Sequence, residues 1–130
     1  MILKFFEIKK KSIDNYKYFL LYGKNKGLIE ETIQKDLKPI ASNNIYSYEE
    51  NEVLNNIEHF KEDILNKSFF ENEKLIIIQR TSDKILKILE ELIELEIEDI
   101  KMILISDSLD KKSKLRSFFE KNKKTVCIAF

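Results

Sequence analysis

The chain has 130 residues, of which 43% are hydrophobic and 35% are charged, and its 23 basic residues balance its 23 acidic ones. This length predicts one domain with a buried core, and the zero net charge argues against a free-standing nucleic-acid binder, which usually carries a basic excess. The single cysteine excludes an internal disulfide and no apolar run is long enough to span a membrane, so a cytoplasmic protein is expected.

Apolar periodicity predicts alternating strands and helices along the chain. An opening helix is expected around Ile2, Phe5 and Phe6. Five strands are then expected near residues 17–22, 44–48, 74–79, 101–106 and 124–129, with helices at 26–38, 50–67, 84–96 and 111–122. The third and fourth strands are apolar throughout, as strands buried on both faces are. The pattern predicts an α/β fold in which helices cover both faces of a parallel sheet.

The turn after the first of these strands has the layout of a phosphate-binding loop. Gly23 and Gly27 lie between a strand and a helix, as in P-loop NTPases, but only three residues separate them. A working loop reads G-x-x-x-x-G-K-[ST], where the Lys contacts phosphate oxygens and the hydroxyl holds Mg²⁺. Aligned on Gly27, those two positions hold Leu28 and Ile29; aligned on Gly23, they hold Ile29 and Glu30. The loop is therefore predicted to be degenerate.

The third strand lacks the acidic residues that would complete an ATPase site. Ile76 to Ile78 are followed by Gln79, Arg80 and Thr81, so no carboxylate is present to order Mg²⁺ or activate water. Two separate losses predict a domain that does not hydrolyse ATP, with no metal and no cofactor.

Four other polar residues are weighed and set aside. Asp107 and Asp110 follow the fourth strand, where α/β sheets bind ligands, but Asp110 is expected to cap the next helix and Asp107 to close a turn. His59 has no nucleophile near it in sequence and is expected to be a surface or half-buried residue rather than a base. Cys127 lies within a strand and is expected to pack as an inert hydrophobic residue.

Phe69 and Phe70 end the long helix and precede a polar turn before the third strand. Two interpretations stay open for this pair. The rings belong either to the core, or to an exposed helix corner from which they fill a partner's pocket.

Three motifs in order along the chain resemble the N-terminal domain of the delta subunit of bacterial DNA polymerase III, a component of the clamp loader. They are Leu20-Leu21-Tyr22-Gly23-x-x-x-Gly27, Ser68-Phe69-Phe70-x-x-x-Lys74-Leu75-Ile76-Ile77-Ile78, and Leu109-Asp110-Lys111-Lys112-Ser113-Lys114-Leu115. The resemblance implies an AAA+-like three-layer sandwich with five parallel strands in the order 5-1-4-3-2. It also implies a single N-terminal domain taken from a longer chain, whose lid and collar domains are absent.

The resemblance further implies a function without intrinsic catalysis. Family members bind the ring-shaped sliding clamp, the beta subunit, and help to open it, while other loader subunits hydrolyse ATP. DNA-directed DNA polymerase activity belongs to the holoenzyme. A hydrophobic pair before the third strand enters the clamp in this family, and that pair falls on Phe69 and Phe70. Contacts with other loader subunits would pass through the missing domains, and DNA would be met only indirectly.

Two function classes are therefore carried forward. The first is a catalytically inert module that docks on the sliding clamp. The second is an atypical nucleotide-binding P-loop-like enzyme, which saturable ATP binding would reveal. A receiver-like signalling domain is disfavoured, because Tyr22-Gly23-Lys24 offers no acidic cluster after the first strand.

Overall fold

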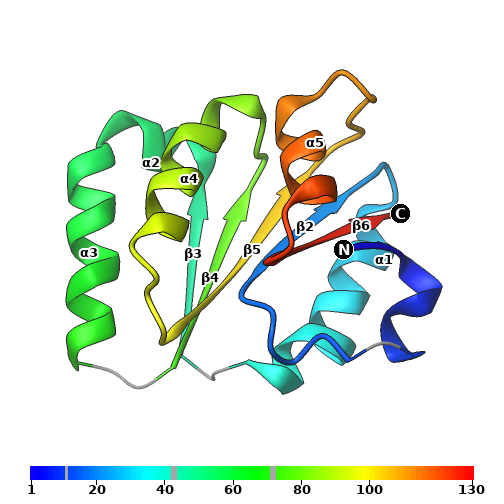
Figure 1. The fold of residues 1–130 in the computed structure, drawn as a ribbon, viewed down its shortest axis with the longest axis horizontal. Helices are drawn as coiled ribbons and strands as arrows, with labels where there is room; N and C mark the ends of the chain where they lie inside the picture. Colours follow the sequence, from blue (N-terminus) through cyan, green and yellow to red (C-terminus); the bar gives the residue numbers. More distant parts are fainter. Residues whose placement is uncertain (11, 42–43, 71–72) are drawn as a thin grey trace.

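A computed structural model describes residues 1–10, 12–41, 44–70 and 73–130, with the side chains of all of these except residues 10 and 67–70. Its centre is a six-stranded sheet in which every strand pair is parallel (Figure 1). The strand order is β1-β6-β2-β5-β4-β3. The strands are β1 (Ile2–Lys4), β2 (Tyr18–Tyr22), β3 (Ile45–Glu49), β4 (Lys74–Gln79), β5 (Ile100–Ser106) and β6 (Thr125–Ala129).

Helices cover both faces of the sheet and make three layers (Figure 1). One face is covered by α2 (Glu50–Asn55), α3 (Ile57–Phe70), the 3₁₀ turn η4 (Asp83–Ile85), α4 (Leu86–Glu94) and α5 (Lys114–Lys121). The other face is covered by the 3₁₀ helix η1 (Phe5–Lys10), α1 (Lys26–Thr32), the π-helical turn η2 (Ile33–Leu37) and the 3₁₀ turn η3 (Lys38–Ile40). A buried hydrophobic cluster lies on each face of the sheet. Neighbouring residues of a strand point into opposite clusters, and the interior strands are apolar throughout because both of their faces are buried. The predicted parallel sheet with helices on both faces is confirmed.

The predicted count of five strands, and with it the order 5-1-4-3-2, is wrong, because the chain begins with a sixth strand. Residues 2–4 form β1 where a helix was expected, and β1 pairs with β6 at the edge of the sheet. Leu3 is buried between exposed neighbours, and the backbone N–H of Cys127 donates to the Met1 carbonyl oxygen at 2.8 Å. The five expected strands lie beside one another in the order β6-β2-β5-β4-β3, and β1 extends the sheet beyond β6.

Two predicted helices are divided in the structure. The helix expected over 50–67 is interrupted at Asn56, whose backbone leaves the helical region (φ −150°, ψ 72°). The Asn56 side chain then accepts a hydrogen bond from the His59 backbone N–H at 3.3 Å, as a residue at a helix start does. The helix expected over 26–38 is α-helical only to Thr32, and its last two turns are η2 and η3, with Pro39 in the latter.

Candidate functional site

Gly23 ends β2 and turns the chain towards α1, so the predicted strand, turn and helix are present. Its φ of +144° is one that other residues rarely adopt, and a Cβ atom built on it would lie 2.5 Å from the carbonyl oxygen of Phe130. Phe130 is held there by its backbone N–H, which donates to the Tyr22 carbonyl oxygen at 3.0 Å. The packing of Phe130 therefore explains why position 23 is a glycine, and no phosphate-binding role is needed to explain it.

The backbone N–H groups of this turn are largely committed to the protein itself. The Gly23 N–H donates to the Ser106 carbonyl oxygen at 3.3 Å. The Leu28 N–H donates to the Asn25 side chain and the Ile29 N–H to the Asn25 carbonyl oxygen, each at 3.1 Å. A phosphate cradle requires such groups to face the ligand. Asn25 thus occupies donors that an NTPase would offer to phosphate.

The two positions where a P-loop carries Lys and Ser or Thr hold no ligand for phosphate. Gly27 lies inside α1 rather than in the loop, since the helix begins at Lys26. Ile29 is only 2% exposed and packs in the core below α1. Leu28 is half-buried and apolar. The degenerate loop predicted from Gly23, Gly27, Leu28 and Ile29 therefore has the strand-to-helix geometry without the side chains that bind a nucleotide.

The end of β4 is also committed to internal contacts. Arg80 is exposed, has a positive φ of 56° and forms an ion pair with Glu49 at 3.6 Å. Thr81 is buried, and its Oγ1 lies 2.6 Å from the Oγ of Ser106 at the end of β5. These hydroxyls join two strands at the edge where an ATPase would place its acidic residue.

A small pocket lies between α1 and the carboxyl ends of β4 and β5, with a volume of about 250 Å³. This is below the roughly 300–1,000 Å³ of typical ligand pockets. Its rim includes an exposed ion pair of 3.6 Å between Lys26 and Asp107. Within the residues that the structure describes, no group of three or more His, Cys, Asp and Glu side chains could hold a metal ion.

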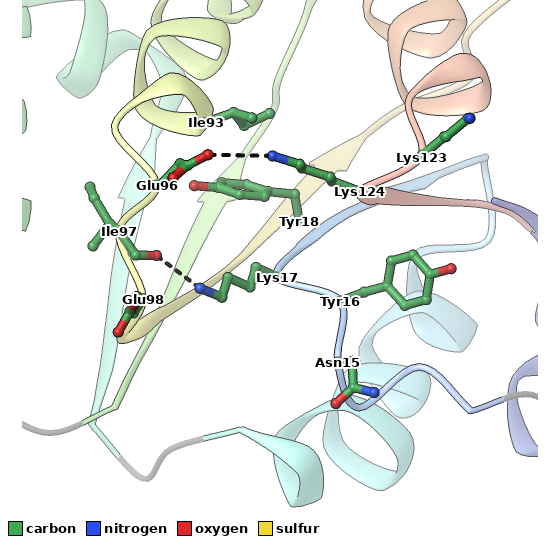
Figure 2. Close-up of a pocket in the computed structure, with 10 residues that line it drawn as sticks. All are labelled: Asn15, Tyr16, Lys17, Tyr18, Ile93, Glu96, Ile97, Glu98, Lys123 and Lys124. Carbon is green, nitrogen blue, oxygen red and sulfur yellow. Dashed lines mark hydrogen bonds and ion pairs between the residues drawn. The ribbon is translucent and has the colours of Figure 1, made fainter.

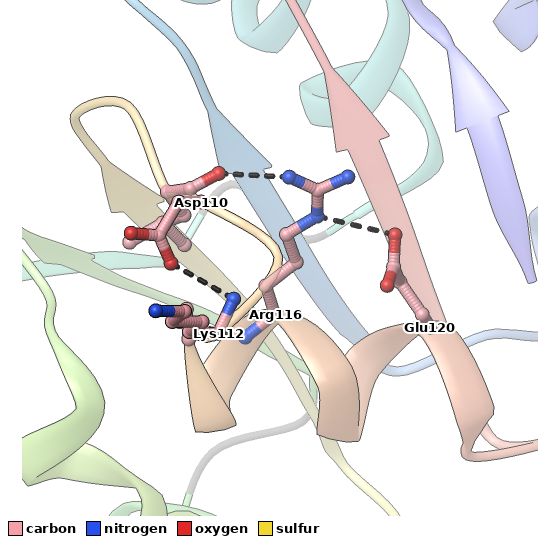
Figure 3. A network of polar contacts seen from close by, with 6 residues as sticks. Asp110, Lys112, Arg116 and Glu120 are labelled. Carbon is pink, nitrogen blue, oxygen red and sulfur yellow. Dashed lines mark hydrogen bonds and ion pairs between the residues drawn. The ribbon is translucent and has the colours of Figure 1, made fainter.

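Asp110 does not cap α5, contrary to the prediction from the sequence. The cap is Ser113, whose Oγ accepts from the Arg116 N–H at 3.2 Å, while Asp110 accepts from the Lys112 N–H at 2.8 Å and closes the preceding turn (Figure 3). Sequence reasoning did not anticipate that Asp83, which lies about 30 residues earlier in the chain, contacts the start of α5. Its carboxylate accepts from the Ser113 hydroxyl at 2.7 Å and from the backbone N–H groups of Lys114 and Leu115 at 3.1 and 3.0 Å.

The Asp83 contacts lower the pKa of that carboxyl group, chiefly through the Leu115 N–H and then through the Ser113 hydroxyl. The segment 109–115 is part of the family resemblance. Within it, Ser113 and the N–H groups of Lys114 and Leu115 therefore serve to cap α5. Asp83 is at the start of η4, so this contact also ties η4 to α5. A carboxylate at this distance in sequence gives no local signal.

The remaining side chains behave as predicted. His59 is exposed on α3. Cys127 is buried in β6, and burial raises the pKa of its thiol to about 12, which disfavours a reactive thiolate. Ser82 is the N-cap of η4, since its Oγ accepts from the Lys84 N–H at 3.3 Å.

The predicted clamp contact lies at the opposite edge of the sheet from the degenerate loop. Phe69 and Phe70 are the last residues of α3, and β4 begins at Lys74, so the pair precedes the amino end of a strand. The strands are parallel, and the six residues of β4 span about 20 Å between the two edges. The side chains of Phe69 and Phe70 lie outside the described residues, so the choice between core and exposed rings stays a prediction.

A second pocket at the amino edge was not anticipated from the sequence. It has a volume of about 560 Å³ and is lined by the start of β2, the α4–β5 connection and the α5–β6 connection (Figure 2). Lys17 donates to the Ile97 carbonyl oxygen at 3.3 Å, and Lys124 lies 3.8 Å from Glu96. Tyr18 lines the pocket, and burial raises its pKa to about 12. Its residues come from three separate segments, which no spacing along the chain could bring together.

Comparison with known proteins identifies one family. No curated protein matches the chain. The family described as DNA polymerase III, delta subunit, matches residues 19–129. This match covers all the strands except β1, together with the loop, the end of α3 and the segment before α5. The chain therefore belongs to the DNA polymerase III delta subunit family.

Proposed function

We propose that this chain is the AAA+-like N-terminal domain of a clamp-loader delta subunit, which binds the sliding clamp and helps to open it during DNA replication. The observation that carries the proposal is the family match over residues 19–129. The domain acts in the cytoplasm as part of the polymerase III holoenzyme. Its lid and collar domains, which join it to the other loader subunits, lie outside these 130 residues.

The domain acts without hydrolysing ATP. The proposal is supported by the buried Ile29 at a position that would hold a P-loop hydroxyl, and by the Thr81–Ser106 contact where an acidic residue would order Mg²⁺. No helix in the described part of the chain is long and apolar enough to cross a membrane. The energy for opening the clamp then comes from the ATPase subunits of the loader, and this domain contributes binding energy.

Phe69 and Phe70 form the clamp contact in this proposal. Their place at the last turn of α3, immediately before β4, is the place of the hydrophobic pair that the family resemblance implies. The distance of about 20 Å between the two sheet edges separates this contact from the degenerate loop. Clamp binding therefore needs no nucleotide in this domain.

The test is capture of the cognate sliding clamp by the wild-type chain and by the double variant Phe69→Ala/Phe70→Ala. Loss of capture in the variant is expected. The exposed aromatic pair Phe5 and Phe6, 41% and 60% exposed, provides a matched control, because it lies in η1 on the other face of the sheet. Equal capture by the wild type and the Phe69/Phe70 variant would reject the assignment of the contact.

A further inference from the structure

The charge of the chain is unevenly distributed although it sums to zero. Residues 110–124 hold seven basic and two acidic side chains, a net charge of +5, so the rest of the chain carries −5. This basic segment consists of α5 and its two flanking turns. It is the part of the surface best suited to attract an acidic partner.

A broad, open depression of about 490 Å³, called the groove below, lies between the first residue of α4 and one face of α5, within this basic region. Leu86 and Phe118, both half-buried, supply its apolar part. Exposed lysines at 112, 114 and 121 surround it. Lys114, Phe118 and Lys121 are spaced i, i+4 and i+7 on α5, which places them on one face of the helix. The groove therefore combines an apolar base with positive charges on its rim.

In the described part of the chain no ion pair holds the rim lysines, although Lys114 lies close enough to Asp83 to help lower the pKa of that carboxyl group. Among the residues that the structure describes, Lys112, Lys114 and Lys121 form no ion pair within 4.0 Å. The one arginine of the region is occupied, because Arg116 contacts the Glu120 carboxylate at 3.2 Å and donates to the Leu109 carbonyl oxygen at 2.9 Å (Figure 3). The lysines are thus the groups free to pair with charges from outside the chain.

The apolar base favours a protein segment over a nucleic acid. A nucleobase would stack on a flat exposed ring, whereas Phe118 is half-buried and packs edge-to-face against Phe119 at 5.9 Å between ring centroids. Leu86 offers an aliphatic surface that suits an aliphatic or aromatic side chain. The whole chain also has zero net charge, so it lacks the basic excess that is typical of nucleic-acid binders.

We propose that the groove between α4 and α5 binds a short acidic segment of a protein partner, with an apolar side chain on Leu86 and Phe118 and carboxylates on the rim lysines. This surface belongs to neither the degenerate loop nor the end of α3. It gives the domain a second protein contact besides the proposed clamp contact.

The probe is a fluorescein-labelled peptide, Glu-Glu-Leu-Phe-Glu-Glu, whose binding is followed by fluorescence anisotropy. Wild-type chain should bind it at low ionic strength and release it as salt screens the lysines. The triple variant Lys112→Glu/Lys114→Glu/Lys121→Glu should bind it about tenfold more weakly or worse, because three exposed attractions become repulsions. Replacing Leu-Phe in the peptide by Ala-Ala should weaken binding as well.

The matched control is Lys9→Glu/Lys24→Glu/Lys38→Glu, which makes the same charge change in η1, in the turn before α1 and in η3, away from the groove, and should leave binding close to that of the wild type. Ser117→Trp fills the groove without changing charge and should also weaken binding. Circular dichroism verifies that each variant is folded. The proposal is overturned if the wild type does not bind the peptide, if the control loses as much affinity as the rim variant, or if oligothymidylate binds more tightly than the peptide.

Discussion

The hydroxyl oxygens of Thr81 and Ser106 lie 2.6 Å apart and join the ends of β4 and β5 in the buried edge of the sheet. Ser106 Oγ is also 2.9 Å from the Thr81 carbonyl oxygen, and Thr81 Oγ1 is 3.0 Å from the Ile105 carbonyl oxygen. The edge at which an ATPase orders its metal is here a closed hydrogen-bond network. Its polar groups satisfy one another, so they stabilise the fold instead of binding a ligand.

Removing one of these hydroxyls should therefore destabilise the domain. Ser106→Ala removes the hydroxyl that donates to the Thr81 carbonyl oxygen, and a buried acceptor left without its donor costs about 1–3 kcal/mol of unfolding free energy. Urea denaturation measures the unfolding free energy of Ser106→Ala, of Thr81→Val and of the double variant. The double variant should lose less than the sum of the two single losses, because both act on one network. Strict additivity would contradict the coupling.

Asp83 should make the stability of the domain depend on acid pH. The pKa of Asp83 is lower in the folded chain than its ordinary value of about 3.9, so its contribution is full above that value and is lost as the pH falls through the folded-state pKa. Asp83→Ala should cost about 1–2 kcal/mol at neutral pH, the value of a helix cap, since Lys114 and Leu115 lose their acceptor.

Thermal unfolding at pH 7 and near pH 3 compares the two proteins. The gap between wild type and Asp83→Ala should narrow at the lower pH, where the wild-type carboxylate begins to be protonated. Asp110→Ala is the matched control, because the Asp110 carboxylate accepts from the Lys112 N–H in the preceding turn and, among the described residues, from no N–H of a helix. An Asp110→Ala loss as large as that of Asp83→Ala would contradict the capping assignment.

The two glycines of the loop should respond oppositely to alanine. Gly23→Ala places a Cβ 2.5 Å from the Phe130 carbonyl oxygen at a φ of +144°, and should destabilise the domain by about 2 kcal/mol or more. Gly27 lies in α1, where an added Cβ would meet only the Asn25 Oδ1 at an ordinary contact distance of 3.8 Å, so Gly27→Ala should stabilise the domain by up to about 1 kcal/mol. Denaturation midpoints of the two variants decide the matter. Similar losses at both positions would show that Gly27 has a role beyond the helix.

ATP should not bind saturably to the wild-type domain, with or without Mg²⁺. The variant Leu28→Lys/Ile29→Thr should not gain ATPase activity, because no carboxylate directly follows β4, and it should unfold more easily, because Ile29 is buried. Isothermal titration calorimetry and a phosphate-release assay measure both points. Turnover by the wild type would instead support the atypical nucleotide-binding enzyme.

Much of this fold could be predicted from local sequence. The apolar run at 74–79 coincides with β4, and the other interior strands begin within about two residues of the predicted positions, because burial on both faces demands continuous apolar residues. β1 could not be recognised, because Ile2, Phe5 and Phe6 have a helix-like spacing and the pairing partner Cys127 is distant in sequence. Asn56 interrupts the helix, although Val53, Ile57 and Phe60 continue its apolar face.

The site was predictable where it depends on missing residue types and unpredictable where it depends on distant contacts. The sequence around Gly27 is enough to show that Lys and Thr are lacking. The fit of Phe130 against Gly23 and of Asp83 against Ser113 requires the assembled sheet, since each contact joins residues about 30 or more positions apart. Their place at a helix corner made Phe69 and Phe70 candidates for a partner contact, and only the family resemblance assigned that contact to the clamp.

The most direct test of the central claim is the dissociation constant of the cognate sliding clamp, measured by surface plasmon resonance for three proteins. These are the wild type, Phe69→Ala/Phe70→Ala, and the control Phe5→Ala/Phe6→Ala. Truncating an interface anchor typically costs about 2 kcal/mol or more, so the Phe69/Phe70 variant should bind tens of fold more weakly with little change in thermal stability. The control should bind like the wild type. Clamp binding unchanged in the Phe69/Phe70 variant, or a stability loss of about 3–5 kcal/mol for each Phe as core truncation gives, would contradict the account.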